Sequence, residues 1–346
     1  MLLTNKTFAL LQILQLIALF SFALGKHIDH VFNRVKVITG YDEDDDEPYD
    51  YFRVNVTWGF TYCEQVEIGD TFSLNMPYVF GVNAIDDTGA YTQKFDLKLS
   101  DNTVIANCDI DGAFGRKKST TINCEVQYEL QTHRGLQGWL EFPVNFEGGG
   151  RVETILEADH WKPGSNVITF NDELSTIVKF HMENHAKQRE EIYRHTYDDE
   201  LFFYYAAPKD MCYHNGGYKA IESGDLGISI TPSEYEYDTI EAYHTRNFSR
   251  FSFPEGYEDF NDYHLHKFEN GMHIIFGEMR GNERIWISGY VRGQLEPSTP
   301  LVVQTGVNLL CVDGTWDNDT SKDVYFLRGY PALSGGRNKC EYLDLP

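Results

Sequence analysis

Hydrophobic and polar residues alternate along much of the chain after its first 25 residues. In residues 52–62, FRVNVTWGFTY, every second residue is apolar, so one face of a strand would be buried and the other would meet solvent. Residues 69–81, GDTFSLNMPYVFG, repeat the pattern as far as Pro77, which cannot donate a ladder hydrogen bond and so ends the strand or confines it to an edge. Residues 140–146, LEFPVNF, alternate in the same way. The pattern predicts an all-β protein.

One segment interrupts the strand-rich pattern. Residues 183–197, ENHAKQREEIYRHTY, are polar and have a helical character, and they separate two strand-rich halves. About 320 residues after the first 25 are too many for one typical core. We therefore expect two tandem immunoglobulin-like β-sandwich domains, at residues 26–183 and 198–330. A linker at 184–197, which could hold a short helix, joins them, and a C-terminal tail follows at 331–346.

The first 25 residues are typical of a secretory signal peptide, because Lys6 precedes an apolar run at residues 8–24 that ends in small residues. No later window is apolar and long enough for a membrane helix. We therefore expect an extracellular, secreted protein, either free or associated with a cell wall. Three sequons agree with this route, at Asn55, Asn247 and Asn318. Asn55 lies on the polar face of its strand, so we expect it to be glycosylated most readily.

Charge and cysteine content narrow the class of partner. The chain has 53 acidic and 29 basic residues, which gives a formal net charge of -24. Such a charge repels phosphate backbones and argues against nucleic acid as a partner. The six cysteines include no CxxC pair, and an even number fits disulfides in an oxidising compartment better than a zinc site.

Several clusters were considered as metal or catalytic sites. The acidic run at residues 41–50, YDEDDDEPYD, could bind Ca²⁺ but is more often a solvated loop. His264 and His266 would share a strand face and could hold a metal, although a surface pair is the commoner explanation. No GxSxG or cysteine–histidine motif is present, and a glycosidase carboxylate pair stays open. We therefore expect no metal, no cofactor and no enzyme activity.

Four stretches resemble the N-terminal adhesion region of the yeast agglutinin-like (Als) adhesins and of the related α-agglutinin. They are GDTFSLNMPYVF at 69–80, ANCDIDGAFGRKKSTTINCEV at 106–126, FPVNFEGGG at 142–150 and WKPGSNVITFND at 161–172. Weaker matches follow in the same order through the second half. The resemblance implies two immunoglobulin-like domains that mediate cell adhesion by binding protein or peptide ligands, without catalysis.

The resemblance also implies a disulfide pattern. Family bridges correspond to Cys108 with Cys124 and to Cys212 with Cys311. Cys63 and Cys340 remain, and they would either staple the two domains together or link the chain to a cell-wall partner. Two other family bridges are missing as pairs: Tyr78 and Trp161 occupy the places of one, and Ser223 and Lys267 those of the other.

The family's ligand recess is altered in this sequence. In Als adhesins a lysine directly after CVF holds the C-terminal carboxylate of the ligand in a recess between the domains. That position is Gly81 here, and the family's LRWTGY is shortened to LRGY at 327–330. One hypothesis keeps the recess, with Arg328 as its cation and Phe80 and Tyr330 as its lining. The other is that Gly81 only opens a turn and the recess is closed.

Three functions stay open on this basis. The leading one is an adhesin-type binding module. A secreted carbohydrate-active β-sandwich protein, lectin or hydrolase, is the second, because aromatic residues make up 14% of the chain and acidic residues are in surplus. The third is a truncated, non-adhesive paralogue, because the family's Thr-rich segments, stalk and wall anchor are absent from this sequence.

Overall fold

The computed structural model describes most of the chain after the first 24 residues. The described ranges are 25–41, 47–60, 66–128, 135–181, 190–196, 200–208, 210–231, 235–260, 262–293, 300–325 and 329–339. The first 24 residues, half of the acidic run (residues 42–46), Cys63, Arg328 and Cys340 therefore lie outside the described residues. Among the helices that are described, none has both the length and the apolar character that a membrane span requires.

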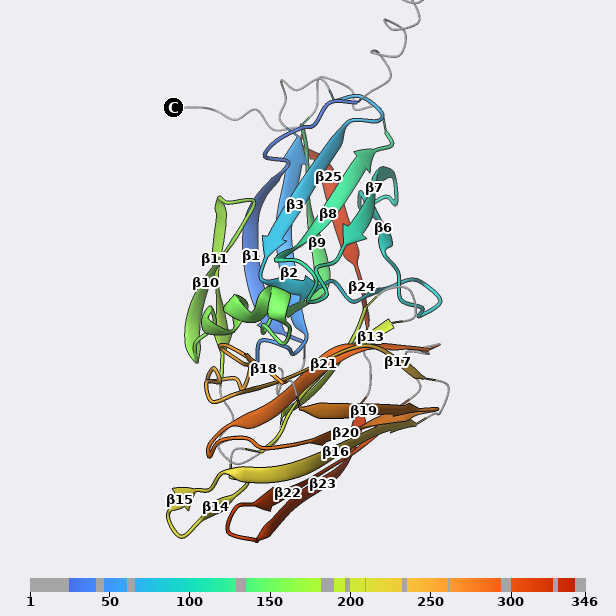
Figure 1. Cartoon of the computed structure of the whole chain (residues 1–346). Helices are drawn as coiled ribbons and strands as arrows, with labels where there is room; N and C mark the ends of the chain where they lie inside the picture. The colour runs from blue at the N-terminus through green and yellow to red at the C-terminus, as the bar shows by residue number, and fades with distance from the viewer. Residues whose placement is uncertain are drawn as a thin grey trace, which may run out of the picture.

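The first β-sandwich contains two main antiparallel sheets (Figure 1). One has the strand order β1 (Phe32–Gly40), β2 (Phe52–Phe60), β9 (Gly135–Phe146) and β25 (Leu333–Lys339), and the short β4 (Val79–Gly81) also pairs with β9. The other has the order β3 (Thr71–Pro77), β8 (Ser119–Val126), β7 (Val104–Asp111) and β6 (Lys94–Lys98). A hairpin of β10 (Gly164–Phe170) and β11 (Leu174–Phe180) and a 3₁₀ helix, η1 (Val152–Asp159), complete this half.

The predicted alternation in the first sandwich is confirmed. Along β2, buried and half-buried residues alternate without a break, and Trp58 has no exposed surface. In β3 the inward residues are Phe72, Leu74 and Met76, and Pro77 is the last residue of the strand. Phe72 lies 5.5 Å from Phe32 between ring centroids, so side chains from both sheets meet in a single apolar layer.

The second β-sandwich has two antiparallel sheets of five strands each. One has the order β12 (Glu190–His195), β13 (Glu200–Ala206), β21 (Arg284–Arg292), β17 (Glu236–Thr245) and β18 (Glu258–Asp259). The other, which we call the outer sheet, has the order β19 (Tyr263–Phe268), β20 (Gly271–Phe276), β16 (Ile221–Thr231), β22 (Leu301–Cys311) and β23 (Trp316–Tyr325). A two-residue hairpin joins β14 (Tyr213–His214) to β15 (Gly217–Tyr218). The fold is thus all-β, with two tandem immunoglobulin-like sandwiches.

The segment between the sandwiches differs from the helical interpretation. Residues 190–195 form strand β12, which pairs along its length with β13, so a helix there is wrong. Strand β12 is an edge strand, because it pairs on one side only, and charged residues are common on such edges. Pairing with a neighbouring strand overrides the helical propensity of the segment.

The C-terminal segment returns from the second sandwich to the first (Figure 1). Strand β24 (Tyr330–Pro331) pairs in parallel with β5 (Ala84–Ile85). Strand β25 then adds to the first sheet beside β9, and Ser334 accepts a 2.8 Å hydrogen bond from the amide of Lys98 in the opposite sheet. The tail predicted at 331–346 is therefore a strand of the first sandwich over residues 333–339.

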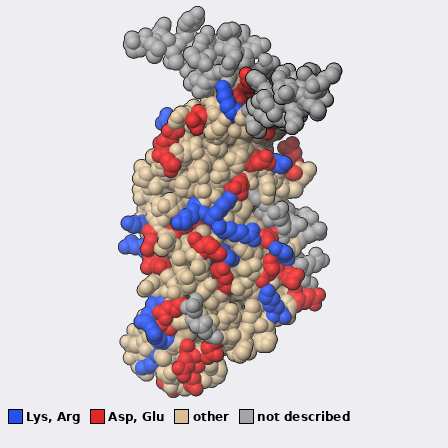
Figure 2. Space-filling model, turned by 45° about the horizontal axis from the view of Figure 1, so that its top comes forward, with Lys and Arg blue, Asp and Glu red and all other residues tan. Residues whose placement is uncertain are grey.

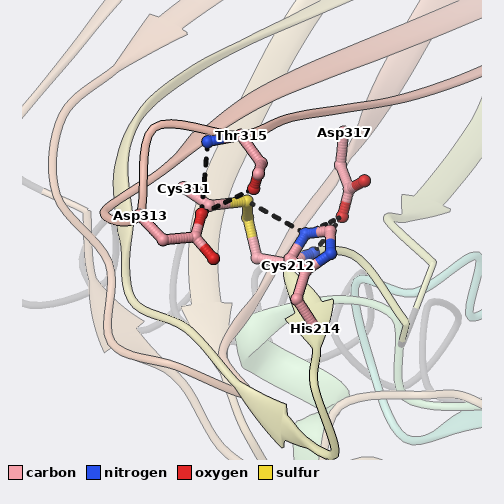
Figure 3. The surroundings of a disulfide bond; sticks show 6 residues. All are labelled: Cys212, His214, Cys311, Asp313, Thr315 and Asp317. Atoms are coloured by element: carbon pink, nitrogen blue, oxygen red, sulfur yellow. Dashed lines mark hydrogen bonds and ion pairs between the residues drawn. A yellow bond between two sulfur atoms is a disulfide. The ribbon is translucent and has the colours of Figure 1, made fainter.

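Each sandwich contains one disulfide among the described cysteines. Cys108–Cys124 joins neighbouring strands β7 and β8. Cys212–Cys311 joins residues 99 positions apart, and His214 and Asp317 flank it (Figure 3). At the place of one missing family bridge, the rings of Tyr78 and Trp161 lie 5.8 Å apart. A ring contact thus joins the two positions where the resemblance places a covalent bond.

The sequon asparagines differ in exposure. Asn247 and Asn318 are exposed. Asn55 points out of β2 as its parity predicts, but it is half-buried and its Nδ2 donates to Glu141 Oε2 at 3.4 Å. Glycosylation stays a prediction at all three, and the structure favours Asn247 and Asn318 over Asn55.

Candidate binding site at the domain junction

Aromatic rings of the second domain pack directly on a triple glycine of the first. A Cβ atom at Gly148 would lie 2.1 Å from the ring of Phe253, and one at Gly150 would lie 3.2 Å from Phe202. The first distance is too short for any side chain, and the second would require the ring of Phe202 to move. The stretch 148–150 is therefore glycine because only bare backbone allows the two domains to approach this closely.

Phe80 and Gly81 lie in this junction, and a ring of the chain itself covers them. Phe114 packs edge-to-face on Phe80 with centroids 5.6 Å apart, and Phe80 in turn contacts Phe202 of the second domain at 5.2 Å. A Cβ atom at Gly81 would lie 2.4 Å from Phe114. The position of the family's lysine is thus filled by a phenyl ring, and Gly81 is required by that ring.

Phe114 is held in this position by two backbone contacts. Its amide donates to the carbonyl of Phe80 at 2.7 Å, and its carbonyl accepts a hydrogen bond from the hydroxyl of Tyr290 in the second domain. Its φ of 50° is in the left-handed region, which is uncommon for a phenylalanine. The left-handed turn aims the ring at Gly81, so an uncommon backbone conformation occurs at the candidate site.

Tyr330 lies at the same junction but contacts a different set of rings. It stacks on Tyr41 with centroids 3.8 Å apart, and its amide donates to the carbonyl of Asn83 at 3.1 Å. The Asn83 side chain donates to Asn145, which is the cross-strand partner of Gly81. Tyr330 and Gly81 are therefore linked through the buried side chains of Asn83 and Asn145. Arg328, the predicted cation, lies outside the described residues.

Two arginines of the first domain pair with acidic residues of the second. Arg116 contacts Glu200 at 2.6 Å, and Arg151 contacts Glu241 at 2.6 Å. The ring of Tyr290 lies between the two guanidinium groups, 3.9 Å from Arg116 and 5.1 Å from Arg151. Burial raises the pKa of Tyr290, so its hydroxyl stays protonated and donates to Phe114. We call these two ion pairs and the Tyr290 ring the charged layer. It joins the two domains next to the aromatic contacts of Phe80, Phe114 and Phe202.

Two buried carboxyl groups lie behind the charged layer. Burial raises the pKa of Glu147 to about 7, although the amide of Gly149 donates to its Oε1 at 3.0 Å. Burial also raises the pKa of Glu157, which Lys118 lowers in part. One oxygen of each carboxyl has no hydrogen-bond partner among the described residues. The Glu147 carboxyl group therefore keeps its proton to a higher pH than an exposed glutamate does.

On the face that Figure 2 shows, the acidic side chains do not form one continuous patch. Figure 2 shows basic and acidic side chains next to one another across the middle of the visible face. An arrangement of this kind does not select ligands by charge alone. The junction therefore offers aromatic and backbone contacts, with arginines at its rim.

Sequence reasoning found Phe80, Gly81 and Tyr330 and missed the residues that close the junction. Phe114 lies in the family-like stretch at 106–126, but no periodic pattern indicates that its ring reaches Gly81. The triple glycine at 148–150 was the available signal, because three successive glycines mark a place where another backbone or ring approaches closely. Tyr290 and Arg151 carried no signal, since they come together only through domain packing.

Comparison with known proteins places the chain in a family. The family model described as "Agglutinin-like protein, N-terminal domain" matches residues 57–311, which include parts of both sandwiches and the junction between them. The chain belongs to this agglutinin-like family. The resemblance stated from the sequence is thereby confirmed.

Curated relatives agree with this membership. Agglutinin-like protein 7 of Candida albicans is 22% identical over 335 residues, which is 88% of this chain and 19% of that protein. Alpha-agglutinin of Saccharomyces cerevisiae is 25% identical over 232 residues, which is 59% of this chain and 31% of that protein. The chain thus spans less than a third of either relative. The crystal structure of the collagen adhesin of S. aureus aligns at 11% identity and a TM-score of 0.43, covering 92% of this chain and 100% of that chain, and this likeness carries no further argument.

Proposed function

We propose that the chain is the ligand-binding region of a cell-surface adhesin that recognises protein or peptide ligands at the junction of its two domains. The observation that carries the proposal is that the family match extends over parts of both sandwiches and the junction between them, so it is not confined to one domain. The protein acts outside the cell and without catalysis. Attachment to the cell wall through Cys63 or Cys340 is part of the same proposal.

The geometry of the junction supports a difference in ligand binding from lysine-bearing relatives. Gly81 supplies no ammonium group, and the Phe114 ring occupies the space beside it. A peptide would have to displace that ring before its end could approach Gly81. We therefore propose weak peptide binding that depends little on a free C-terminal carboxylate, with Arg328 as the remaining candidate cation.

Binding assays on two variants test this site. Gly81→Lys alone would clash with Phe114, so the informative variant is Gly81→Lys combined with Phe114→Ala, with Phe114→Ala as its matched control. In a desolvated recess the new ammonium should favour peptides with a free carboxylate over amidated peptides by ~1 to 3 kcal/mol. Surface plasmon resonance with immobilised protein and both peptide forms measures the difference. Equal binding of both forms by the wild type, the control and the double variant would exclude the junction as a ligand site.

A separate assay tests the adhesive function itself. Beads coated with the chain should aggregate cells or bind a peptide library, and they should show no selective binding on a glycan array. Selective glycan binding without peptide binding would instead support the carbohydrate-active alternative. The bead assay does not depend on Gly81, so it can fail or succeed independently of the recess.

A further inference from the structure

The outer sheet carries three histidines on one face of a hairpin, away from the junction. His264 and His266 are on the edge strand β19, and His273 on β20 is the direct cross-strand partner of His266. Met272 and Ile274 flank His273 and are buried, so all three histidines point outward. Directly opposed Cα atoms are about 5.5 Å apart in such a pair, and neighbours on one face of a strand are about 7 Å apart. Rotation of exposed side chains can therefore bring the three imidazoles to one point.

The ring of His273 is already oriented for such a convergence. Its Nε2 lies 3.3 Å from Asp225 Oδ1 on β16, and a Cβ atom at Gly227 would lie 3.9 Å from its Cδ2. The edge of the ring that carries Cδ2 and Nε2 therefore faces β16. The opposite edge carries Nδ1 and is therefore turned away from β16, toward the side of the sheet on which β19 pairs with β20.

The contact between His273 and Asp225 also points to a metal, in addition to the shared face of the three histidines. A histidine that binds a metal through one ring nitrogen usually donates its other N–H to a carboxylate, which fixes the tautomer and the ring orientation. Asp225 is itself held by a 3.0 Å hydrogen bond from Asn308 Nδ2. The chain of hydrogen bonds from Asn308 through Asp225 to His273 therefore leaves Nδ1 of His273 as the nitrogen that can bind a metal.

We propose that His264, His266 and His273 bind a Zn²⁺ ion on the outer face of the second domain. Three imidazole nitrogens suit a first-row transition metal, and they satisfy three positions of a tetrahedral Zn²⁺ site with bonds of about 2.0 Å. The fourth position faces solvent. A water molecule, or a carboxylate or imidazole of another molecule, completes the coordination.

Two groups of described residues have donor atoms within metal-binding distance of one another without any side-chain rotation, and the chemistry of each disfavours a metal. His244, Glu258 and Glu283 lie together, but Glu283 already accepts hydrogen bonds from the Arg246 guanidinium at 3.0 Å and from the Arg280 amide at 2.8 Å. Positive side chains around that carboxylate repel a dication. The cysteines beside Asp317 are in the disulfide and offer no thiolate.

Zinc titration of the full mature chain tests the proposal. Isothermal titration calorimetry with ZnCl₂ should show one Zn²⁺ per chain in the wild type. His266→Gln and His273→Gln should each weaken that binding by more than tenfold. Asp225→Asn, which keeps the size of the side chain but removes its charge, should weaken it by roughly 10- to 100-fold. Glu258→Gln is the matched control for the other cluster and should leave Zn²⁺ affinity unchanged.

Two results would overturn the site. The first is that the wild type takes up no Zn²⁺ at millimolar concentration. The second is that His266→Gln combined with His273→Gln retains wild-type affinity. Loss of the binding in Glu258→Gln would likewise place the ion at the other cluster and overturn the site. Thermal unfolding without metal should give the same midpoint for every variant, so that a loss of binding is not a loss of fold.

Discussion

At the scale of single residues, Glu147 makes stability depend on pH. Its pKa in the folded protein is raised from 4.5 to about 7 by burial, so its contribution is fully present below about pH 4.5 and is lost as pH rises through 7. In the wild type the free energy of unfolding should therefore fall by on the order of 3 kcal/mol as the pH rises from about 4.5 to above 7. Glu147→Gln should remove this fall. Urea unfolding at a series of pH values measures it. Glu222→Gln, on an exposed side chain, is the control, and a wild-type profile in Glu147→Gln would contradict the prediction.

At the scale of elements, the addition of β25 to β9 depends on glycine. A Cβ atom at Gly138 would lie 2.3 Å from the carbonyl oxygen of Gly335 and 2.4 Å from the ring of Trp58. Gly138→Ala should therefore separate β25 from β9 and lower the free energy of unfolding by about 1 to 3 kcal/mol. Gly306→Ala is the control, since its nearest contact would be 3.7 Å away. Hydrogen exchange of the β25 amides should rise only in Gly138→Ala.

At the scale of the whole molecule, the junction holds the two sandwiches as one unit. Gly148→Val would push a side chain into Phe253 of the second domain and should part the domains at a cost of about 1 to 3 kcal/mol. Small-angle scattering should then show a larger radius of gyration, and calorimetry should resolve two transitions where the wild type has one. An unchanged radius in Gly148→Val would mean that the aromatic contact does not fix the domain arrangement.

The sequence by itself determined the local structure. A period of two shows which residues of β2 and β3 face inward, because every strand side chain alternates between the faces of its sheet. Four stretches between residues 69 and 172 indicated the family. The family in turn implied the sandwich fold and the disulfides Cys108–Cys124 and Cys212–Cys311, which the structure contains. These features depend on residues near one another in the chain or on matches to known motifs.

Only the tertiary structure decided what happens where distant segments meet. The segment 190–195 became a strand because β13 offered it backbone partners, and residues 333–339 joined the first sheet because β9 had a free edge. Phe114 fills the space at Gly81 because a left-handed turn aims its ring there and Tyr290 of the other domain holds it. Packing of this kind depends on the shapes of two surfaces brought together by the fold, and no periodicity in the sequence records it.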